Sequence, residues 1–345
     1  MKPIVEGALY SRALGRVVLY PLASWGYRRF VSTGSTPSPA YRAMRKLYGN
    51  ADTGLFVRLV DASKANHGMT ATAARDGETN GIAAGAIDAV LAQLHEDGFA
   101  VLDRLLPTDL CDDLEVVARA AECALIGREG RLPGRQRFDE ANPVAIRYDI
   151  DEGDVLGSRA AQLLIADASL FAIAEGYLGA TPVQDLVAMW WSAAAGSRST
   201  STTARAAAAQ QFHFDLDRLR FLKVFVFLTD VNERTGPHVY VRGSHRGLPR
   251  HLRRDGRHGD DEVLAALGHD VRMITGPRGT VFLADTIGLH KGKNLETGHR
   301  LVFQTEYATS LFGAPYGTPT VRAPIPEFAA MRERHPASFA RFRST

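Results

Sequence analysis

The clearest helical pattern in the chain begins near residue 84 and ends at Gly98. Its apolar side chains recur at i, i+3, i+4 and i+7, at Ile87, Val90, Leu91 and Leu94. This spacing predicts an amphipathic helix, and glycine is a common helix terminator. A short strand is expected at 99–102, and a second helix from the N-cap candidate Thr108 to about Leu125. A third helical stretch covers 158–178.

After Gly179 the pattern changes to short apolar runs separated by Gly, Pro and Asn. The expected strands are VQDLVAMWW, FHFDL, FLKVFVFLTDV, HVYVRG, TVFLAD and RLVFQTEYAT, with one further strand upstream at 145–150. Many short strands without alternating helices favour an antiparallel sandwich or barrel. We therefore expect a mainly β protein with flanking helices (α+β), in which a helical N-terminal layer covers a jelly-roll core.

The first 85 residues follow neither pattern, and we interpret residues 1–85 as a basic extension and linker of unknown role. An apolar helical stripe is expected at Leu9, Leu14, Val17 and Val18. Pro21 is expected to end or kink that helix. The Ser/Thr/Pro/Gly stretch at 32–42 predicts a loop, and the polar stretch at 51–83 predicts a flexible lead-in.

The composition is that of a folded protein: of 345 residues, 45% are hydrophobic and 23% charged. The chain contains no run of eighteen apolar residues, so no membrane-spanning helix is expected. The net charge of +3 is unevenly distributed. Residues 1–50 hold eight Lys and Arg and one acid, a net +7, whereas the other 295 residues hold 33 basic and 37 acidic residues, a net −4. The body is therefore mildly acidic.

The basic extension is consistent with three roles. The preferred one is an arm that packs on the domain or on a partner subunit. Contact of residues 1–30 with an anionic membrane surface is less favoured, and a targeting peptide is the third role. The two cysteines, Cys111 and Cys123, exclude a disulfide framework. Both are expected on one helix, roughly 18 Å apart, as reduced thiols of a cytoplasmic protein.

Candidate chemistry begins at His213 and Asp215, in the segment QFHFDLD. On a strand, residues i and i+2 project from the same face, so the imidazole and the carboxylate point into one site. Such a pair alone is a weak signal. His290 follows the predicted strand TVFLAD and provides a third candidate ligand, which completes the set of a 2-His-1-carboxylate iron site.

Arg300 stands ten residues after His290, at the head of an apolar strand. A guanidinium buried there needs an anion, because an unpaired buried charge is costly. A bidentate grip on a carboxylate ligand and a structural salt bridge would both satisfy it.

His213, Asp215, His290 and Arg300, in this order and spacing along the chain, resemble the pattern of the phytanoyl-CoA dioxygenase family. Its members are iron(II)- and 2-oxoglutarate-dependent oxygenases built on a double-stranded β-helix. The resemblance covers about 86–315, is most specific at 211–308, and predicts an oxygenase domain at 86–345. It implies His213, Asp215 and His290 as catalytic iron ligands, Arg300 as the residue that binds the far carboxylate of 2-oxoglutarate, and O2 as the oxidant. Related halogenases lack the carboxylate ligand, so Asp215 favours hydroxylation or desaturation.

This chain departs from the family pattern in two places: the segment that holds His213 and Asp215, called the metal segment below, and the N-terminal extension. Members often have Trp before the first ligand, where this chain has Phe212. The extension lies outside the resemblance and inherits no role from it.

Three further residues are candidates for cofactor binding: Lys223, Thr229 and Gln304. Lys223 and Thr229 share one face of the strand that follows the metal segment, although Lys223 also suits a structural place at the strand edge. Gln304 and Glu306 are four and six residues after Arg300 and are therefore expected on the same face of the strand. This position suits either a supporting role beside the metal ligands or simple burial.

Other segments are weaker candidates for substrate contacts. Arg147 and Tyr148 begin an upstream strand, and Trp190 and Trp191 precede a small-residue stretch that suits a mobile lid or a plain connector. Five arginines lie within 246–262, at positions 246, 250, 253, 254 and 257. They suit either a solvated loop or attraction of an anionic substrate. No motif supports nucleic-acid binding.

The function expected from this sequence is oxidation of an unactivated carbon in a small organic substrate, with conversion of 2-oxoglutarate to succinate. One alternative is a metal-dependent cupin isomerase or lyase that needs no cosubstrate and does not use Arg300. The other is a non-catalytic binding protein recruited through its basic arm. The sequence selects neither a substrate nor an oligomeric state.

Overall fold

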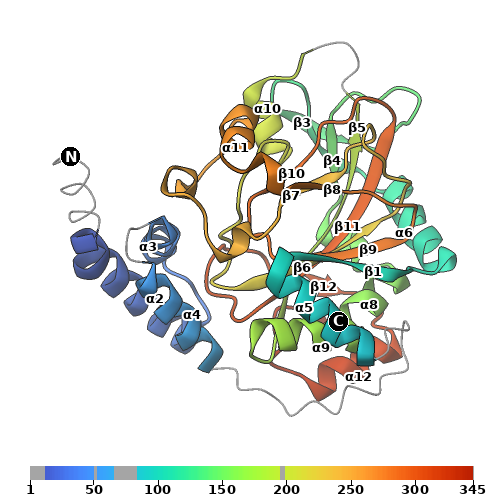
Figure 1. Ribbon diagram of the computed structural model, residues 1–345. Coiled ribbons are helices and arrows are strands. Elements are labelled where there is room, and N and C mark those ends of the chain that lie inside the picture. Colours follow the sequence, from blue (N-terminus) through green and yellow to red (C-terminus); the bar gives the residue numbers. More distant parts are fainter. Residues whose placement is uncertain (1–11, 50–52, 66–83, 195–198, 345) are drawn as a thin grey trace.

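The computed structural model describes residues 12–49, 53–65, 84–194 and 199–344, and its centre is a pair of facing antiparallel sheets (Figure 1). The large sheet runs, in spatial order, β1 (Phe99–Leu105), β9 (Thr280–Ala284), β6 (Phe221–Phe227), β11 (His299–Ala308), β5 (Val183–Ala193), β4 (Arg147–Asp149), β2 (Cys123–Ile126) and β3 (Arg131–Gln136). The small sheet is β10 (His290–Gly292), β7 (His238–Val241) and β8 (Val271–Ile274). A short parallel pair joins β12 (Thr320–Val321) to β13 (Arg343–Ser344). The expected fold class, a jelly-roll β core with flanking helices, is confirmed.

Alternation along β6 shows how the large sheet is buried on both faces. Phe225 and Phe227 belong to an apolar cluster that also contains Tyr240 of the small sheet, so they fill the space between the two sheets. Val224 and Val226 point the other way, into the cluster shared with the helices. Because side chains alternate across a strand, every residue of β6 is buried. Strand β6 is therefore a rigid support for Lys223, the one charged residue that it carries.

The helices of the body cover the outer face of the large sheet and the ends of the barrel (Figure 1). They are α5 (Ala84–Asp97), α6 (Thr108–Ala120), α7 (Glu152–Val155), α8 (Arg159–Ile165), α9 (Ala168–Leu178), α10 (Thr202–Ala207), α11 (Asp260–Leu267) and α12 (Pro326–Arg334). The 3₁₀ turns are Ser244–Arg246, Arg250–Arg253 and Gly268–Asp270.

The helical stretch expected at 158–178 is two helices, divided at Asp167. The Asp167 side chain accepts a hydrogen bond from the backbone N–H of Leu170, at 2.8 Å, and so caps α9. Within the described ranges, 159–178 is also the one segment long and apolar enough to cross a membrane, but 78% of it is buried inside the protein. Its apolar composition is accounted for by its place in the core.

The prediction that Cys111 and Cys123 share a helix is wrong. Helix α6 ends at Ala120, because Ala121 turns to an extended conformation. Cys123 begins β2, which pairs with β4. Both cysteines are buried and unbonded, as expected of reduced thiols.

The N-terminal extension is more helical than the sequence predicts. Its elements are a π-helical turn (Gly15–Leu19), α2 (Tyr20–Thr33), α3 (Ser38–Tyr48) and α4 (Gly54–Ala65). Pro21 lies in the first turn of α2 and does not end it, since proline is tolerated there. Ser38–Tyr48 replaces the second part of the expected loop at 32–42, and Gly54–Ala65 replaces part of the expected flexible lead-in. Residues 66–83 lie outside the described ranges.

The predicted apolar stripe of the extension does not face the body. Leu14, Val17 and Val18 are exposed, and Leu9 lies outside the described residues. The buried positions of this first helical stretch are instead Leu19, Ala23 and Tyr27. The buried face of this helical stretch is therefore the one that carries Leu19, Ala23 and Tyr27.

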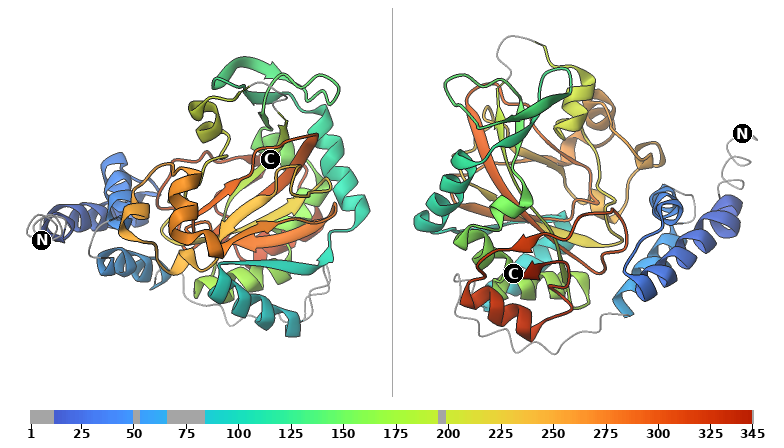
Figure 2. Two further views of the ribbon diagram at one scale, coloured as in Figure 1. Left: turned by 45° about the horizontal axis from the view of Figure 1, so that its top comes forward. Right: turned by 180° about the vertical axis from the view of Figure 1, so that it is seen from behind.

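The helices of the extension lie against one side of the body, as both views in Figure 2 show. Met44, Leu47 and Phe56 share an apolar cluster with Phe214 and Phe312. The rings of Tyr48 and Phe214 lie 4.9 Å apart, and the rings of Tyr27 and Phe312 lie 5.5 Å apart. This agrees with the arm role. The division of the chain at residue 85 stays a prediction.

We expect Leu47→Ala to lower the free energy of unfolding of the whole protein by about 2–5 kcal/mol, because it leaves a cavity in this shared cluster. Val17→Ala is the matched control, and since Val17 is 74% exposed its effect should stay within about 0.5 kcal/mol. Urea unfolding followed by circular dichroism measures both. Equal stability of the two variants would contradict a shared core.

Candidate metal centre and active site

The structure brings His213, Asp215 and His290 together, although the segment that holds the first two is not a regular strand. This corrects the strand expected at FHFDL. His213 and His290 form an isolated antiparallel bridge, with backbone N–H···O distances of 2.9 and 2.8 Å. The backbone N–H of Asp215 donates to the carbonyl of Thr286 at 2.8 Å. The segment is thus held extended by its neighbours, and His213 and Asp215 still point to one side.

The ligand atoms of the three side chains all lie within 4.8 Å of one another. His213 Nε2 is 3.6 Å from Asp215 Oδ1, and His290 Nε2 is 3.6 Å from Asp215 Oδ2. Each Nδ1 faces a backbone carbonyl, that of Gln211 at 2.8 Å and that of Gly288 at 2.9 Å. Because Nδ1 must donate to those carbonyls, the lone pair of each Nε2 is left for a metal.

The protonation states also suit a metal ion. Burial lowers the pKa of His213 and of His290 below the ordinary histidine value, so both rings are neutral at neutral pH. Neutral imidazole is the form that binds a metal. Burial works against ionisation of Asp215, but Lys223, His290 and His213 together outweigh it, and the pKa of Asp215 lies well below its usual value. The set is therefore two neutral nitrogens and one carboxylate.

Lys223 lies at the floor of the site and not at a strand edge, which excludes the snorkelling interpretation. Its Nζ is 2.7 Å from Asp215 Oδ2, 3.4 Å from Glu306 Oε2 and 3.8 Å from Asp217 Oδ2. Burial raises the pKa of Glu306 well above its usual value. Lys223 thus holds the orientation of the Asp215 carboxylate and balances its charge.

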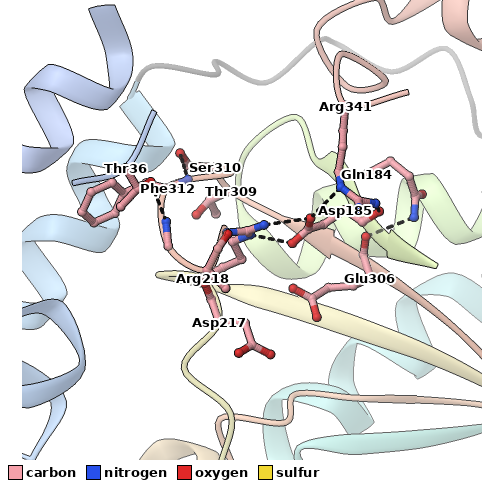
Figure 3. A network of polar contacts seen from close by, with 12 residues as sticks. Thr36, Gln184, Asp185, Asp217, Arg218, Glu306, Thr309, Ser310, Phe312 and Arg341 are labelled. Atoms are coloured by element: carbon pink, nitrogen blue, oxygen red, sulfur yellow. Dashed lines mark hydrogen bonds and ion pairs between the residues drawn. The ribbon is translucent and has the colours of Figure 1, made fainter. Parts of the chain in front are cut away.

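A buried polar network supports this floor from the side of the extension (Figure 3). Arg218 forms a two-pronged ion pair with Asp185, with N–O distances of 2.5 and 3.0 Å. Arg341 donates to the Asp185 carbonyl at 2.8 Å and also pairs with Glu152. Such two-pronged pairs have fixed geometry. They therefore restrict the backbone on both sides of the floor, in β5 and after Asp215.

Arg300 is buried without a carboxylate partner among the described residues. Its guanidinium donates to the carbonyl of Gly236, its Nη2 is 3.5 Å from Ser192 Oγ, and its Nε has no hydrogen-bond partner. Burial, together with the charge of Arg147, lowers the pKa of Arg300 to about 9. The structural salt bridge considered from the sequence is therefore not formed. A buried cation of this kind needs an anionic ligand.

The three candidate ligands, Lys223 and Arg300 line one cavity of about 500 Å³, in the range of small-molecule sites. Its polar lining includes the three candidate ligands, Lys223, Arg300 and Gln304. Its apolar lining includes Trp190, Phe225, Phe227 and Phe282. The end of α10 closes part of the cavity through Ala207, Ala208 and Ala209, so the small-residue stretch before the metal segment does form a wall.

Of the other predicted residues, Trp190 faces the cavity, whereas Thr229, Tyr148 and Trp191 do not line it. Thr229 does not line the cavity, and its Oγ1 accepts a hydrogen bond from the backbone N–H of Leu301 at 3.3 Å. The Tyr148 hydroxyl accepts hydrogen bonds from Val144 and Ala145, outside the cavity. Trp190 and Trp191 lie within β5; Trp190 faces the cavity, and Trp191 donates to the Ala118 carbonyl at 3.2 Å.

Sequence reasoning missed His238, which lies in β7 and lines the same cavity. Its ring stacks on His290, with centroids 5.3 Å apart and an angle of 12° between the planes. Its Nε2 is buried without a hydrogen-bond partner. The alternation of the strand HVYV would have placed His238 and Tyr240 on one face, but nothing in the sequence indicates that this face meets His290.

Comparison with known proteins gives one matching family and several solved structures of low sequence identity. Residues 94–300 match the model of the family described as phytanoyl-CoA dioxygenase (PhyH). The epimerase SnoN from nogalamycin biosynthesis is similar in structure, at 18% identity over 65% of this chain and 81% of that chain, with a TM-score of 0.46. EctD from S. alaskensis gives 20% identity, 70% and 80% coverage, and a TM-score of 0.44.

AviO1 from Streptomyces viridochromogenes Tue57 gives 19% identity over 64% of this chain and 94% of that chain, with a TM-score of 0.42. A search of curated proteins found no match. The family match confirms the resemblance found in the sequence and, with the assembled His213, Asp215 and His290, supports iron(II), 2-oxoglutarate and O2 as the cofactors. Since the matched residues make up more than half of the chain, the protein belongs to the phytanoyl-CoA dioxygenase (PhyH) family.

Proposed function

We propose that the protein is an iron(II)- and 2-oxoglutarate-dependent dioxygenase that hydroxylates or desaturates an unactivated carbon of a small organic substrate. The observation that carries this proposal is the presence of two things in one cavity: a 2-His-1-carboxylate cluster and a buried, unpaired arginine. The first suits non-haem iron, and the second suits a dianionic cosubstrate. A cytoplasmic location is part of the same proposal.

In this mechanism the chain's residues bind and orient the reactants. Nε2 of His213, Nε2 of His290 and the Asp215 carboxylate would hold the metal, and Lys223 would keep that carboxylate ionised. Iron(II) with 2-oxoglutarate supplies oxidation of a C–H bond by O2, with release of succinate and CO2. Three protein ligands leave metal positions for the cosubstrate and O2.

Arg300 would fix the far end of 2-oxoglutarate, because its Nε is free and its charge has no other described counterion. The aromatic lining of Phe225, Phe227 and Phe282 makes one wall of the cavity apolar, and charges pair more strongly in apolar surroundings. The presence of Asp215 supports oxidation of the substrate without halogenation, since the carboxylate occupies a metal position.

Two alternatives remain distinct from this proposal. A cupin isomerase or lyase would use the same metal ligands but would give no reason for a buried, unpaired Arg300. A non-catalytic binding protein would leave the neutral imidazoles and the ionised carboxylate without a role. The proposal accounts for both observations.

We expect anaerobic addition of iron(II) and 2-oxoglutarate to give the weak visible charge-transfer band of a chelated iron centre. Asp215→Ala should abolish the band, because it removes one of three ligands, whereas Asp103→Ala, at an exposed position in β1, should keep it. Absorption spectroscopy of the folded proteins measures this. A band of full strength in Asp215→Ala would contradict the ligand assignment.

We expect Arg300→Gln to weaken 2-oxoglutarate binding at least tenfold, because a charge-assisted pair is lost. Iron binding should be unchanged, since Arg300 is not a ligand. Arg254→Gln is the control, because Arg254 pairs with Glu262 at an exposed site. Titration of the charge-transfer band gives the affinities. An unchanged affinity in Arg300→Gln would favour the cupin alternative.

A further inference from the structure

Of the five arginines in the segment 246–262, the structure selects one for the cavity. Arg257 lines it, together with His213, Asp215 and His290. Arg253 donates to the carbonyl of Leu248, and Arg254 pairs with Glu262 and the carbonyl of Arg257. Of the five arginines that were candidates for attracting an anionic substrate, Arg257 is therefore the one that lines the cavity.

Arg257 is fixed beside the metal segment by its neighbour in the chain. The backbone N–H of His258 donates to the carbonyl of Phe212 at 2.8 Å, next to His213. Nη1 of Arg257 is buried without a hydrogen-bond partner. Burial lowers the pKa of Arg257, and the charge of Asp215 offsets only part of that effect.

Among the cations that line the cavity, Arg257 and Arg300 are the two with a buried, unpaired guanidinium nitrogen, and they act at different places. The charge of Arg257 contributes to the lowered pKa values of His213 and His290. The one charged side chain that affects the pKa of Arg300 is Arg147, which also affects that of Arg257. Arg147 therefore lies within reach of both, and Arg257 is on the side of the metal ligands.

No described carboxylate of the cavity is left to neutralise Arg257. The four acids of the lining each have a basic partner: Asp149 with Arg147, Asp151 with Arg135, Glu152 with Arg341 and Asp215 with Lys223. Arg147 is further held over the ring of Trp190, 4.3 Å from its centroid. Arg300, which is buried, and Arg257, which is half-buried, are thus left without an acidic partner in the lining. One cosubstrate carboxylate at Arg300 would balance one of these two charges.

We propose that the substrate carries an anionic group, a carboxylate or a phosphate or sulfate ester, and that Arg257 binds this group, with Arg147 beside it. The inference rests on the proposed function, because it assigns Arg300 to 2-oxoglutarate. It names Arg257 as a specificity-determining residue. A guanidinium suits this task, since its planar fork matches the oxygens of such groups.

Calorimetric titration with acetate, inorganic phosphate and sulfate tests this binding. Each anion is added at constant ionic strength to the anaerobic protein loaded with iron(II) and 2-oxoglutarate. We expect saturable binding of at least one anion to the wild type, and the preferred anion distinguishes a carboxylate substrate from a phosphate or sulfate ester. Arg257→Gln should weaken it roughly tenfold or more, and Arg257→Lys should retain part of it. Arg250→Gln, at an exposed position of the same segment outside the cavity, should match the wild type.

The affinity for 2-oxoglutarate separates this role from a structural one and from the cosubstrate site. Arg257→Gln should leave that affinity and the charge-transfer band unchanged. Unchanged anion affinity in Arg257→Gln, loss of 2-oxoglutarate affinity in the same variant, or no saturable anion binding by the wild type would each overturn the proposal. Failure of the proposed function is distinguishable, because it removes the charge-transfer band from the wild type itself.

Discussion

The backbone bridge between His213 and His290 is the constraint on which the site depends. Two hydrogen bonds join segments that are far apart in the chain, and they set the two imidazoles beside each other, with ring centroids 4.3 Å apart and Asp215 within 3.6 Å of each Nε2. The segment of His213 has no strand of its own, so its extended form depends on that bridge and on the contact with His258. Packing of the extension against Phe214 then restrains it from behind.

The second organising feature is the balance of buried charge around this bridge. On the floor, Lys223 meets three carboxyl groups, so the metal-binding carboxylate stays ionised in an apolar surrounding. In the rest of the lining, Arg257 and Arg300 lack acidic partners. Unpaired buried charges are costly in an empty protein and become favourable when an anion binds. The cavity therefore has a lining suited to anions next to a metal site.

The sequence predicts the parts of this protein whose signals are local. Apolar alternation identified the strands at 221–227, 280–284 and 299–308, and the order of His213, Asp215, His290 and Arg300 indicated the family. What it could not predict depends on contacts between distant segments. Thr229 shares the parity of Lys223 but lies beyond the cavity, and His238 reaches the site only because β7 pairs with β10. The helix at Gly54–Ala65 is a different case, because its apolar residues Leu55, Phe56, Leu59 and Val60 recur at helical spacing, a local signal that the prediction of a lead-in missed.

The most direct test of the central claim is a crystal structure of the protein grown anaerobically with iron(II) and 2-oxoglutarate. The account predicts one iron bound by His213, Asp215 and His290, with the far carboxylate of 2-oxoglutarate on Arg300 and Arg257 still free for substrate. Iron bound elsewhere, or 2-oxoglutarate seated away from Arg300, would contradict it.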